Sequence, residues 1–302
     1  MGVVRTETDA DRLYALHAMM RKQPKYITVV WRAFRANKIA VAGLAAVILL
    51  FAAALCAQWI TPYQQAISQN VGIRFSPPSL RHIFGTDNLG RDIFARIIHG
   101  SRVSLTMGFA PTIASLLLGM LFGGLAVYSG GWVENVIMRV CDVFTCIPSV
   151  LLALALVAAL GPGFNNVLKA ITIASVPDMT RYVRSVIINI VGLEYIDAAR
   201  ACGSGGPAIV ARHVLPNAMG PLILSAVTNI SGMIMAGAGL SYLGLGIQPP
   251  NPEWGSMLAE GQDYFLRAPH MMIAPGLAIF TAVLAFSLTG DGLRDALDPK
   301  LR

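Results

Sequence analysis

The sequence is dominated by long apolar runs that no charged residue interrupts. The clearest of these runs cover residues 39–60, 103–132, 143–160, 216–245 and 269–288. A helix needs about 20 apolar residues to cross a bilayer, because every backbone amide must find its hydrogen bond inside the helix. Charged residues make up 13% of the chain, against roughly 25% in a typical soluble domain, too few to cover a soluble surface. The sequence therefore predicts an all-α, multi-pass membrane protein.

A sixth candidate span, residues 167–188, is less apolar than the other five. It carries Lys169 near its start and Asp178, Arg181 and Arg184 in its second half. The last three are spaced at i, i+3 and i+6, so they share one side of a helix and can pair. We include this span because an even number of crossings returns the chain to its starting side. The prediction is six transmembrane helices, with this charged end at the cytoplasmic mouth.

Only two acids lie near membrane depth in the sequence, Asp142 and Asp178. Each has an arginine three residues away, Arg139 and Arg181 respectively. Ionisable groups inside a membrane are costly and usually pair with one another. We therefore interpret Asp142, Asp178, Arg181 and Arg184 as structural or gating ion pairs rather than as a catalytic dyad.

The distribution of basic residues predicts the orientation. Of the 23 Lys and Arg residues, 16 fall in segments that six spans place in the cytoplasm, eight of them in residues 1–38. Basic residues favour the cytoplasmic side of a membrane, so residues 1–38 and the tail 291–302 are both predicted to be cytoplasmic. Residues 39–60 then form the first transmembrane helix. The same bias explains the net charge of +7 without a nucleic acid as partner.

Residues 61–101 are predicted to form an extracytoplasmic loop that departs from this bias. Arg91 and Arg96 lie there beside apolar residues at helical spacing, and Arg102 follows directly after the loop. That pattern is typical of an amphipathic helix lying on a membrane surface, and we expect one here.

The motifs of several enzyme classes are missing from the sequence. None of the five lysines follows a glycine, which excludes a GxxxxGK[ST] phosphate loop and hence ATP hydrolysis by this chain alone. Neither HExxH nor GxSxG occurs, and the four cysteines have neither zinc-ligand nor disulfide spacing. We therefore expect no metal or cofactor in this chain, and a transport role rather than an enzymatic one.

The cytoplasmic segment 193–216 is the most informative part of the sequence. It reads as a short helix, a glycine-rich turn and a second short helix, both polar enough to leave the membrane. Such a segment has too little apolar surface to fold against itself, so we expect it to dock on a partner. On physical grounds alone an ordinary cytoplasmic loop remains an equal alternative.

This segment resembles the EAA loop of permease subunits in binding-protein-dependent ABC importers. Its consensus is EAA, three residues, G, nine residues, I, one residue and LP. The matching positions are Ala198, Ala199, Gly203, Leu215 and Pro216. Asp197 replaces the consensus Glu, and His213 stands where the consensus has Ile. In that family the loop is the coupling helix that sits in a groove of the ATPase subunit.

Three more stretches, residues 84–92, 244–258 and 290–300, resemble the C-type permease subunit of dipeptide and oligopeptide importers. The resemblance covers nearly all of residues 27–302. It implies a type I importer fold, in which one N-terminal helix precedes a five-helix core at residues 102–290. It also implies a homologous B-type permease as partner, two ATPase subunits that bind ATP and Mg²⁺, and an extracytoplasmic solute-binding protein. Relatives of this kind import dipeptides, oligopeptides, glutathione, nickel chelates or opines.

The span 216–245 is the best candidate for lining a pathway. Asn229 and Ser231 are polar, and Met233 and Met235 offer adaptable apolar surface. Simple packing of helices through small residues remains an alternative for this span. Outside the membrane, Glu253 and Trp254 are candidate contacts for the binding protein, although Trp254 equally fits a passive interfacial position. A self-contained secondary transporter is a rival, but it predicts an internal repeat that we do not find.

Overall fold

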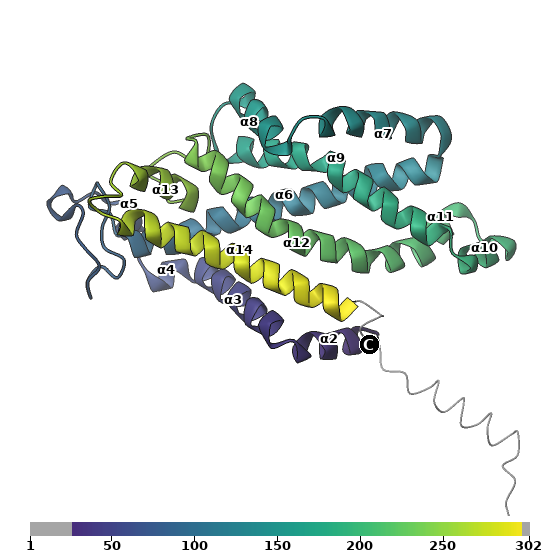
Figure 1. Ribbon diagram of the computed structural model, residues 1–302, viewed down its shortest axis with the longest axis horizontal. Helices are drawn as coiled ribbons and strands as arrows, with labels where there is room; N and C mark the ends of the chain where they lie inside the picture. Colours follow the sequence, from purple (N-terminus) through teal and green to yellow (C-terminus); the bar gives the residue numbers. More distant parts are fainter. Residues whose placement is uncertain (1–25, 298–302) are drawn as a thin grey trace, which may run out of the picture.

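The computed structural model describes residues 26–297, and helices form most of this part of the chain. Figure 1 shows the long helices running along the longest axis of the molecule. The long elements are α3 (Lys38–Leu55), α6 (Ile93–Ser129), α7 (Gly131–Thr145), α9 (Phe164–Val191), α12 (Leu215–Tyr242) and α14 (His270–Leu297). The shorter ones are α2 (Tyr26–Ala36), α4 (Ala57–Ile60), α5 (Tyr63–Ile67), a 3-10 turn at Val71–Ile73, α8 (Ser149–Leu160), α10 (Glu194–Ala201), α11 (Gly206–Ile209) and α13 (Trp254–Gln262).

Four helical segments in the described residues are long and apolar enough to cross a membrane: Lys38–Leu55, Ile93–Ser129, Gly206–Tyr242 and His270–Leu297. The pair α7 and α8 makes a fifth if the two helices count as one broken span. The all-α, multi-pass architecture is confirmed. The total of six transmembrane helices stays a prediction, because α9 must be counted as the sixth. This helix is long enough to cross but carries four charged residues.

The expected span at residues 143–160 is wrong in its boundaries. Its first residues belong to α7, which begins at Gly131, and α8 follows after a bend of 86°. The 12 residues of α8 extend about 18 Å, too short to cross a bilayer alone. Pro148 lies at the bend, and its ring and missing N–H prevent a continuous helix.

The helices α6 and α9 form the most extensive helix pair of the fold. Gly119 and Gly123 of α6 lie against α9, where a Cβ on Gly123 would approach the carbonyl oxygen of Thr180 to 2.8 Å. Two glycines spaced by four residues allow the helix backbones to come this close. This contact fixes the charged half of α9 beside α7.

The amphipathic surface helix expected within residues 61–101 is not found. Residues from Ile93 onward are instead the first turns of α6, which Asp92 begins by accepting a hydrogen bond from the amide of Ala95. Arg91 and Arg96 are 1% exposed rather than facing a membrane surface. Their burial has a physical reason, which is the set of acidic partners described below.

Candidate functional site

The loop between α9 and α12, residues 193–216, forms one end of the molecule (Figure 1). It contains α10 and α11, and a π-helical turn at Val210–Val214 leads from α11 directly into α12. The second short helix expected from the sequence is therefore not a separate element. It is the start of a helical segment that continues from Gly206 to Tyr242.

Gly203 ends α10 in a left-handed backbone conformation, with φ of +82°. Its amide donates to the carbonyl of Arg200 at 2.9 Å, and the amide of Ser204 donates to the carbonyl of Ala199 at 3.1 Å. These two bonds are those of a Schellman cap, which favours glycine at this position. A Cβ on Gly203 would meet no other atom within 4 Å. The left-handed backbone conformation is therefore the feature that requires glycine at position 203 within this chain.

The helix α10 is anchored to the rest of the protein by one buried side chain and by Tyr195, whose hydroxyl accepts a hydrogen bond from Asn217 of α12. Ile196 is fully buried in a cluster with Ile209 and Val214, together with Val183 of α9 and Leu222 of α12. The expectation that the 193–216 loop finds no partner surface inside its own chain is therefore wrong. The physical reason is that α9 and α12 present an apolar patch where they meet the loop.

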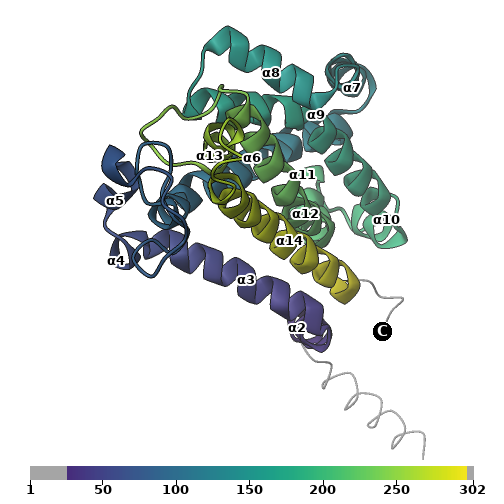
Figure 2. The same cartoon turned by 60° about the vertical axis from the view of Figure 1, so that its left-hand side comes forward.

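The remaining faces of the loop are open to a partner. Most of the positions predicted for ATPase coupling are exposed, namely Asp197, Ala198, Gly203, Leu215 and Pro216, whereas Ala199 is half-buried. Asp197 accepts a hydrogen bond from Arg200 at 3.1 Å on this surface. Figure 2 shows α10 at the rim of the molecule, beyond the ends of α9 and α12.

Two ion pairs connect α7 with α9. Arg181 pairs with Asp142, and Arg184 pairs with Glu134, whose carboxylate also accepts from the Arg184 Nε at 2.7 Å. Arg139 lies 3.9 Å from the carboxylate of Asp142. The sequence-based pairing of Asp142, Arg181 and Arg184 is thus partly correct, but Glu134 was missed as a partner.

Asp178, the fourth residue assigned to these pairs, takes no part in them. Its carboxylate lines a cavity of about 420 Å³ between α6, α8, α9 and α12. Asn229 and Met233, predicted for the pathway, also line this cavity. The other polar lining residues are Ser115, Ser149, Ser175, Tyr182 and Ser225.

The two other pathway candidates lie elsewhere on α12. Ser231 is buried and hydrogen bonds at 3.2 Å to the carbonyl of Val283 and to the hydroxyl of Ser287, both on α14. Met235 is exposed, and it is absent from the cavity lining. The cavity thus follows a face of α12 that includes Asn229 and Met233 but neither Ser231 nor Met235.

At the opposite end from the 193–216 loop, residues 61–92 and 243–269 form a structure that we call the cap (Figure 1). Its centre is a buried group of charges. The Asp87 carboxylate accepts from the Arg91 Nε and the Arg96 Nη1, each at 2.6 Å, and Glu260 of α13 binds both arginines. The two acids thus neutralise the two bases. The four residues also connect the first cap segment, residues 61–92, with α6 and with α13.

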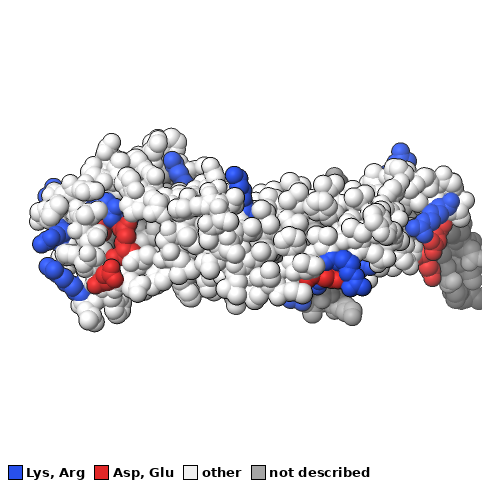
Figure 3. Space-filling model, turned by 90° about the horizontal axis from the view of Figure 1, so that it is seen from above, with Lys and Arg blue, Asp and Glu red and all other residues white. Residues whose placement is uncertain are grey.

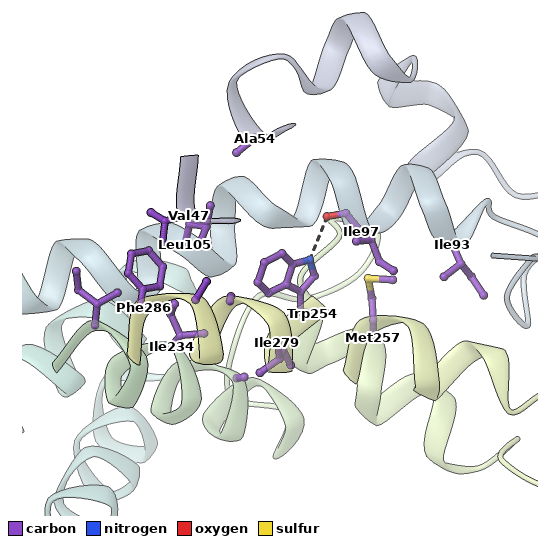
Figure 4. Close-up of a cluster of buried hydrophobic side chains, with 14 of the residues drawn as sticks. Val47, Ala54, Ile93, Ile97, Leu105, Ile234, Trp254, Met257, Ile279 and Phe286 are labelled. Atoms are coloured by element: carbon purple, nitrogen blue, oxygen red, sulfur yellow. Dashed lines mark hydrogen bonds between the residues drawn. The ribbon is translucent and has the colours of Figure 1, made fainter. Parts of the chain in front are cut away.

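Glu253 and Trp254 lie inside this cap and not on its surface. Trp254 is 1% exposed, and its indole N–H donates to the carbonyl of Ile97 at 3.0 Å, as Figure 4 shows. The fully buried Glu253 accepts from the amides of Gly255 and Ser256, both at 2.8 Å, and so caps α13. Burial raises the pKa of Glu253, and these hydrogen bonds partly oppose the rise. The predicted contact of Glu253 and Trp254 with a binding protein is therefore wrong, because neither side chain reaches the surface.

Comparison with known proteins decides the family. The model described as the inner membrane component of binding-protein-dependent transport systems matches residues 115–302, more than half of the chain. The chain belongs to this family. A second model, the N-terminal TM domain of oligopeptide transport permease C, matches residues 25–78 of this permease. The protein is a permease subunit of a binding-protein-dependent ABC importer, as the sequence resemblance implied.

Relatives match this permease over nearly their whole length. It is 43% identical to the di/tripeptide transport system permease protein DppC of Pseudomonas aeruginosa, over 92% of this chain and 94% of the relative. It is 44% identical to the glutathione transport system permease protein GsiD of Pectobacterium atrosepticum, over 90% of each chain.

Solved structures support the fold of the permease. A chain of the MetNI methionine ABC transporter, in an inward-facing conformation, matches with a TM-score of 0.56 and 18% identity. The match covers 68% of the permease and 98% of the MetNI chain. An amino acid ABC transporter crystallised with histidines matches with a TM-score of 0.55. The type I importer fold is thereby confirmed.

On the face of the permease seen in Figure 3, charged side chains gather toward the two ends, and most of the surface between them carries none. This arrangement fits a bilayer around the middle of the molecule. The sequence predicted that charged residues gather at the ends of the spans. It did not predict which acids and arginines pair with one another. Glu134 and Glu260 lack a local signal, because their arginines lie at distant positions of the chain, whereas Asp87 lies only four residues before Arg91.

Proposed function

We propose that this permease forms, with a homologous permease subunit, a pathway for di- and tripeptides or glutathione. The substrate class follows two relatives above 40% identity, a di/tripeptide permease protein and a glutathione permease protein. The observation that carries the proposal is the cavity at Asp178 and Asn229, because polar and apolar side chains both line it. A peptide backbone with varied side chains fits such a lining. A nickel chelate or an opine is the alternative substrate.

The open side of the cavity is where the second permease would complete it. The lining comes from α6, α8, α9 and α12, and α8 contributes only its first turns. A pathway between two related chains would therefore be lined on this side by α6, α8, α9 and α12.

We further propose that the 193–216 loop transmits the movement of two ATPase subunits, which bind ATP and Mg²⁺. The support is that α10 is held by one buried residue, Ile196, while its polar positions remain open. Closure of the ATPases would move α10, and the continuous segment from Gly206 to Tyr242 would carry that movement to the cavity.

The cap would receive substrate from the solute-binding protein. Its core is closed, but the side chains of Leu80 and Leu266 are almost fully exposed. Large apolar side chains at an otherwise well-packed surface favour contact with a partner. These two residues replace Glu253 and Trp254 as the candidate contacts in this proposal.

The proposed topology places the cap outside the cell and both termini in the cytoplasm of a bacterium. Its test is labelling of an Asn70→Cys variant, since Asn70 lies in the cap and is exposed. A membrane-impermeant thiol reagent should reach this cysteine from the outside. Labelling only from the cytoplasmic side would contradict the topology.

Uptake by cells that lack this permease tests the substrate class. Labelled dipeptide, tripeptide and glutathione are offered separately, with and without the gene restored. We expect restored uptake of at least one of these peptides. Restored uptake of a nickel chelate or an opine alone would contradict the peptide assignment, and the ligand that co-purifies with the partner binding protein would identify the true cargo.

A further inference from the structure

The cavity contains an unusual group for a membrane protein, which is a carboxylate near the middle of a long helix. Asp178 lies close to the midpoint of α9, and it is the only lining residue in the described part of the chain that is charged at neutral pH. A charged side chain at membrane depth is costly, so it usually has a partner or a role in moving a substrate.

The arginines nearest to Asp178 on α9 are already engaged elsewhere. Arg181 binds Asp142, and Arg184 binds Glu134. Within residues 26–297 the structure gives Asp178 neither an ion pair nor a hydrogen bond, and its side chain is exposed to the cavity. Its charge is thus available to something that enters the cavity.

The neighbours of Asp178 point to the kind of group that fits. Ser175 donates its hydroxyl to the carbonyl of Ile171 at 2.7 Å, and Tyr182 donates to the carbonyl of Pro221 at 3.2 Å. Asn229 donates through its amide nitrogen to the carbonyl of Ser225 at 2.8 Å.

The donors of these three polar neighbours are therefore occupied, while acceptors remain. The Asp178 carboxylate has acceptors only, and the side-chain oxygen of Asn229 can accept as well, since it is the amide nitrogen that bonds to Ser225. A small cation with several N–H groups satisfies such a lining, whereas a carboxylate would be repelled by Asp178.

We propose that Asp178 determines specificity by holding the ammonium group of a peptide during its passage through the permease. This inference rests on the proposed function, since it takes the cavity as part of the pathway. The α-ammonium group of a free peptide, or of glutathione, carries the charge and the three N–H donors that the lining can accept. A peptide whose amino group is acylated lacks both features.

The test uses the assembled importer with a cysteine placed in the cavity. In a chain whose four native cysteines are replaced by alanine, Ser149→Cys puts a thiol in the lining. Its reaction rates with a cationic and an anionic methanethiosulfonate reagent are compared. A carboxylate in a low-dielectric cleft concentrates cations, so we expect a cationic preference that falls by about tenfold in Asp178→Asn and persists in Asp178→Glu.

A peptide-protection arm identifies the group that Asp178 holds. A glycyl dipeptide should slow the labelling of Ser149→Cys, whereas its N-acetyl derivative should not, and Asp178→Asn should abolish this difference. The matched control is Asp263→Asn, which removes an exposed acid from the cap and should leave the reagent preference unchanged.

Three results would overturn the inference in different ways. A cationic preference that is the same in Asp178→Asn would remove the role of Asp178 while keeping the pathway. Absence of labelling, or of any protection by peptide, would contradict the pathway itself. Loss of co-purification of the two permeases in Asp178→Asn would assign this carboxylate to an ion pair between the chains.

Discussion

The two ends of the permease treat their polar residues in opposite ways. In the cap, Asp87, Arg91 and Glu260 are bound to one another and to Arg96 of α6, and at least three of these four residues are buried. At the 193–216 loop the polar positions are exposed, and the buried side chain of Ile196 holds α10 in place. The difference teaches that the polar groups of the cap are paired within its own chain, whereas the loop leaves polar positions exposed for the proposed contact with an ATPase.

The comparison has a direct consequence for mutations. Changes at the cap should appear first as loss of stability, because they break contacts inside the chain. Changes at the loop should appear first as loss of transport, because the affected surface carries little of the fold.

The largest effect is expected for Arg96→Leu in the cap. This change leaves Asp87 and Glu260 with one base for two acids in a buried site, which costs about 3–5 kcal/mol. Thermal unfolding of the purified complex in detergent measures the loss. Arg139→Leu is the matched control, since the Arg139 side chain is 86% exposed, and it should change the unfolding temperature little. An equal loss of stability in the two variants would contradict the distinction between buried and exposed charges.

A smaller loss is expected for Glu253→Ala, which removes the cap of α13. Two amide donors and Ser104 would then lack their buried acceptor, at a cost of about 1–3 kcal/mol. Glu253→Gln keeps an acceptor oxygen and should retain most of the stability. A Gln variant as unstable as the Ala variant would show that the charge, and not the acceptor, matters.

The same residue predicts a dependence on pH. Because burial raises the pKa of Glu253, the folded protein binds this proton more tightly than the unfolded chain. The contribution of Glu253 to stability should therefore decline as the pH rises above about 4.3, the ordinary glutamate value. Glu253→Gln should flatten this part of the stability profile, measured by thermal unfolding at several pH values. A profile that is unchanged in the Gln variant would contradict the raised pKa.

At the loop, Gly203→Leu should impair transport while the protein remains folded. The left-handed conformation at Gly203 costs a residue with a Cβ roughly 1–2 kcal/mol. Uptake and co-purification of the ATPases should fall by about tenfold or more, with expression and unfolding temperature near normal. Gly203→Asn tolerates this conformation better and should be milder. Full uptake and an intact complex in Gly203→Leu would separate this loop from ATPase coupling.

The smallest effect is expected for Asp197→Ala. Asp197 is exposed, and an ion pair at the rim of an interface is worth about 0–1 kcal/mol. Uptake should therefore stay within a few-fold of the unchanged protein. A loss as severe as that of Gly203→Leu would mean that Asp197, and not the backbone of the loop, makes the main contact.

The fold was largely predictable because its main signal is local. An apolar run such as residues 216–245 predicts a helix from its own composition, and α12 confirms it. The break between α7 and α8 also had a local signal, Pro148, which the length of the apolar run concealed. The left-handed glycine at position 203 was predictable for the same reason, since its place after a short helix suggested a cap.

The partners of buried charges were not predictable in this way. Arg91 and Arg96 beside apolar residues resemble a surface helix until Glu260, far along the chain, is known to bind them. Trp254 resembled an interfacial residue because its partner, the carbonyl of Ile97, belongs to another helix. Asp178 was assigned to Arg181 from their spacing, but the competing acid Asp142 comes from α7.

Protection of Cys202 tests most directly the claim that the 193–216 loop is completed by an ATPase. Cys202 is a native, exposed thiol next to Gly203, and Cys146, exposed between α7 and α8, serves as an internal control. Both are modified with a thiol reagent, with and without the ATPase subunits, and the modified peptides are quantified by mass spectrometry. We predict that the ATPases protect Cys202 and leave the modification of Cys146 unchanged. Equal modification of Cys202 in both preparations would contradict the account.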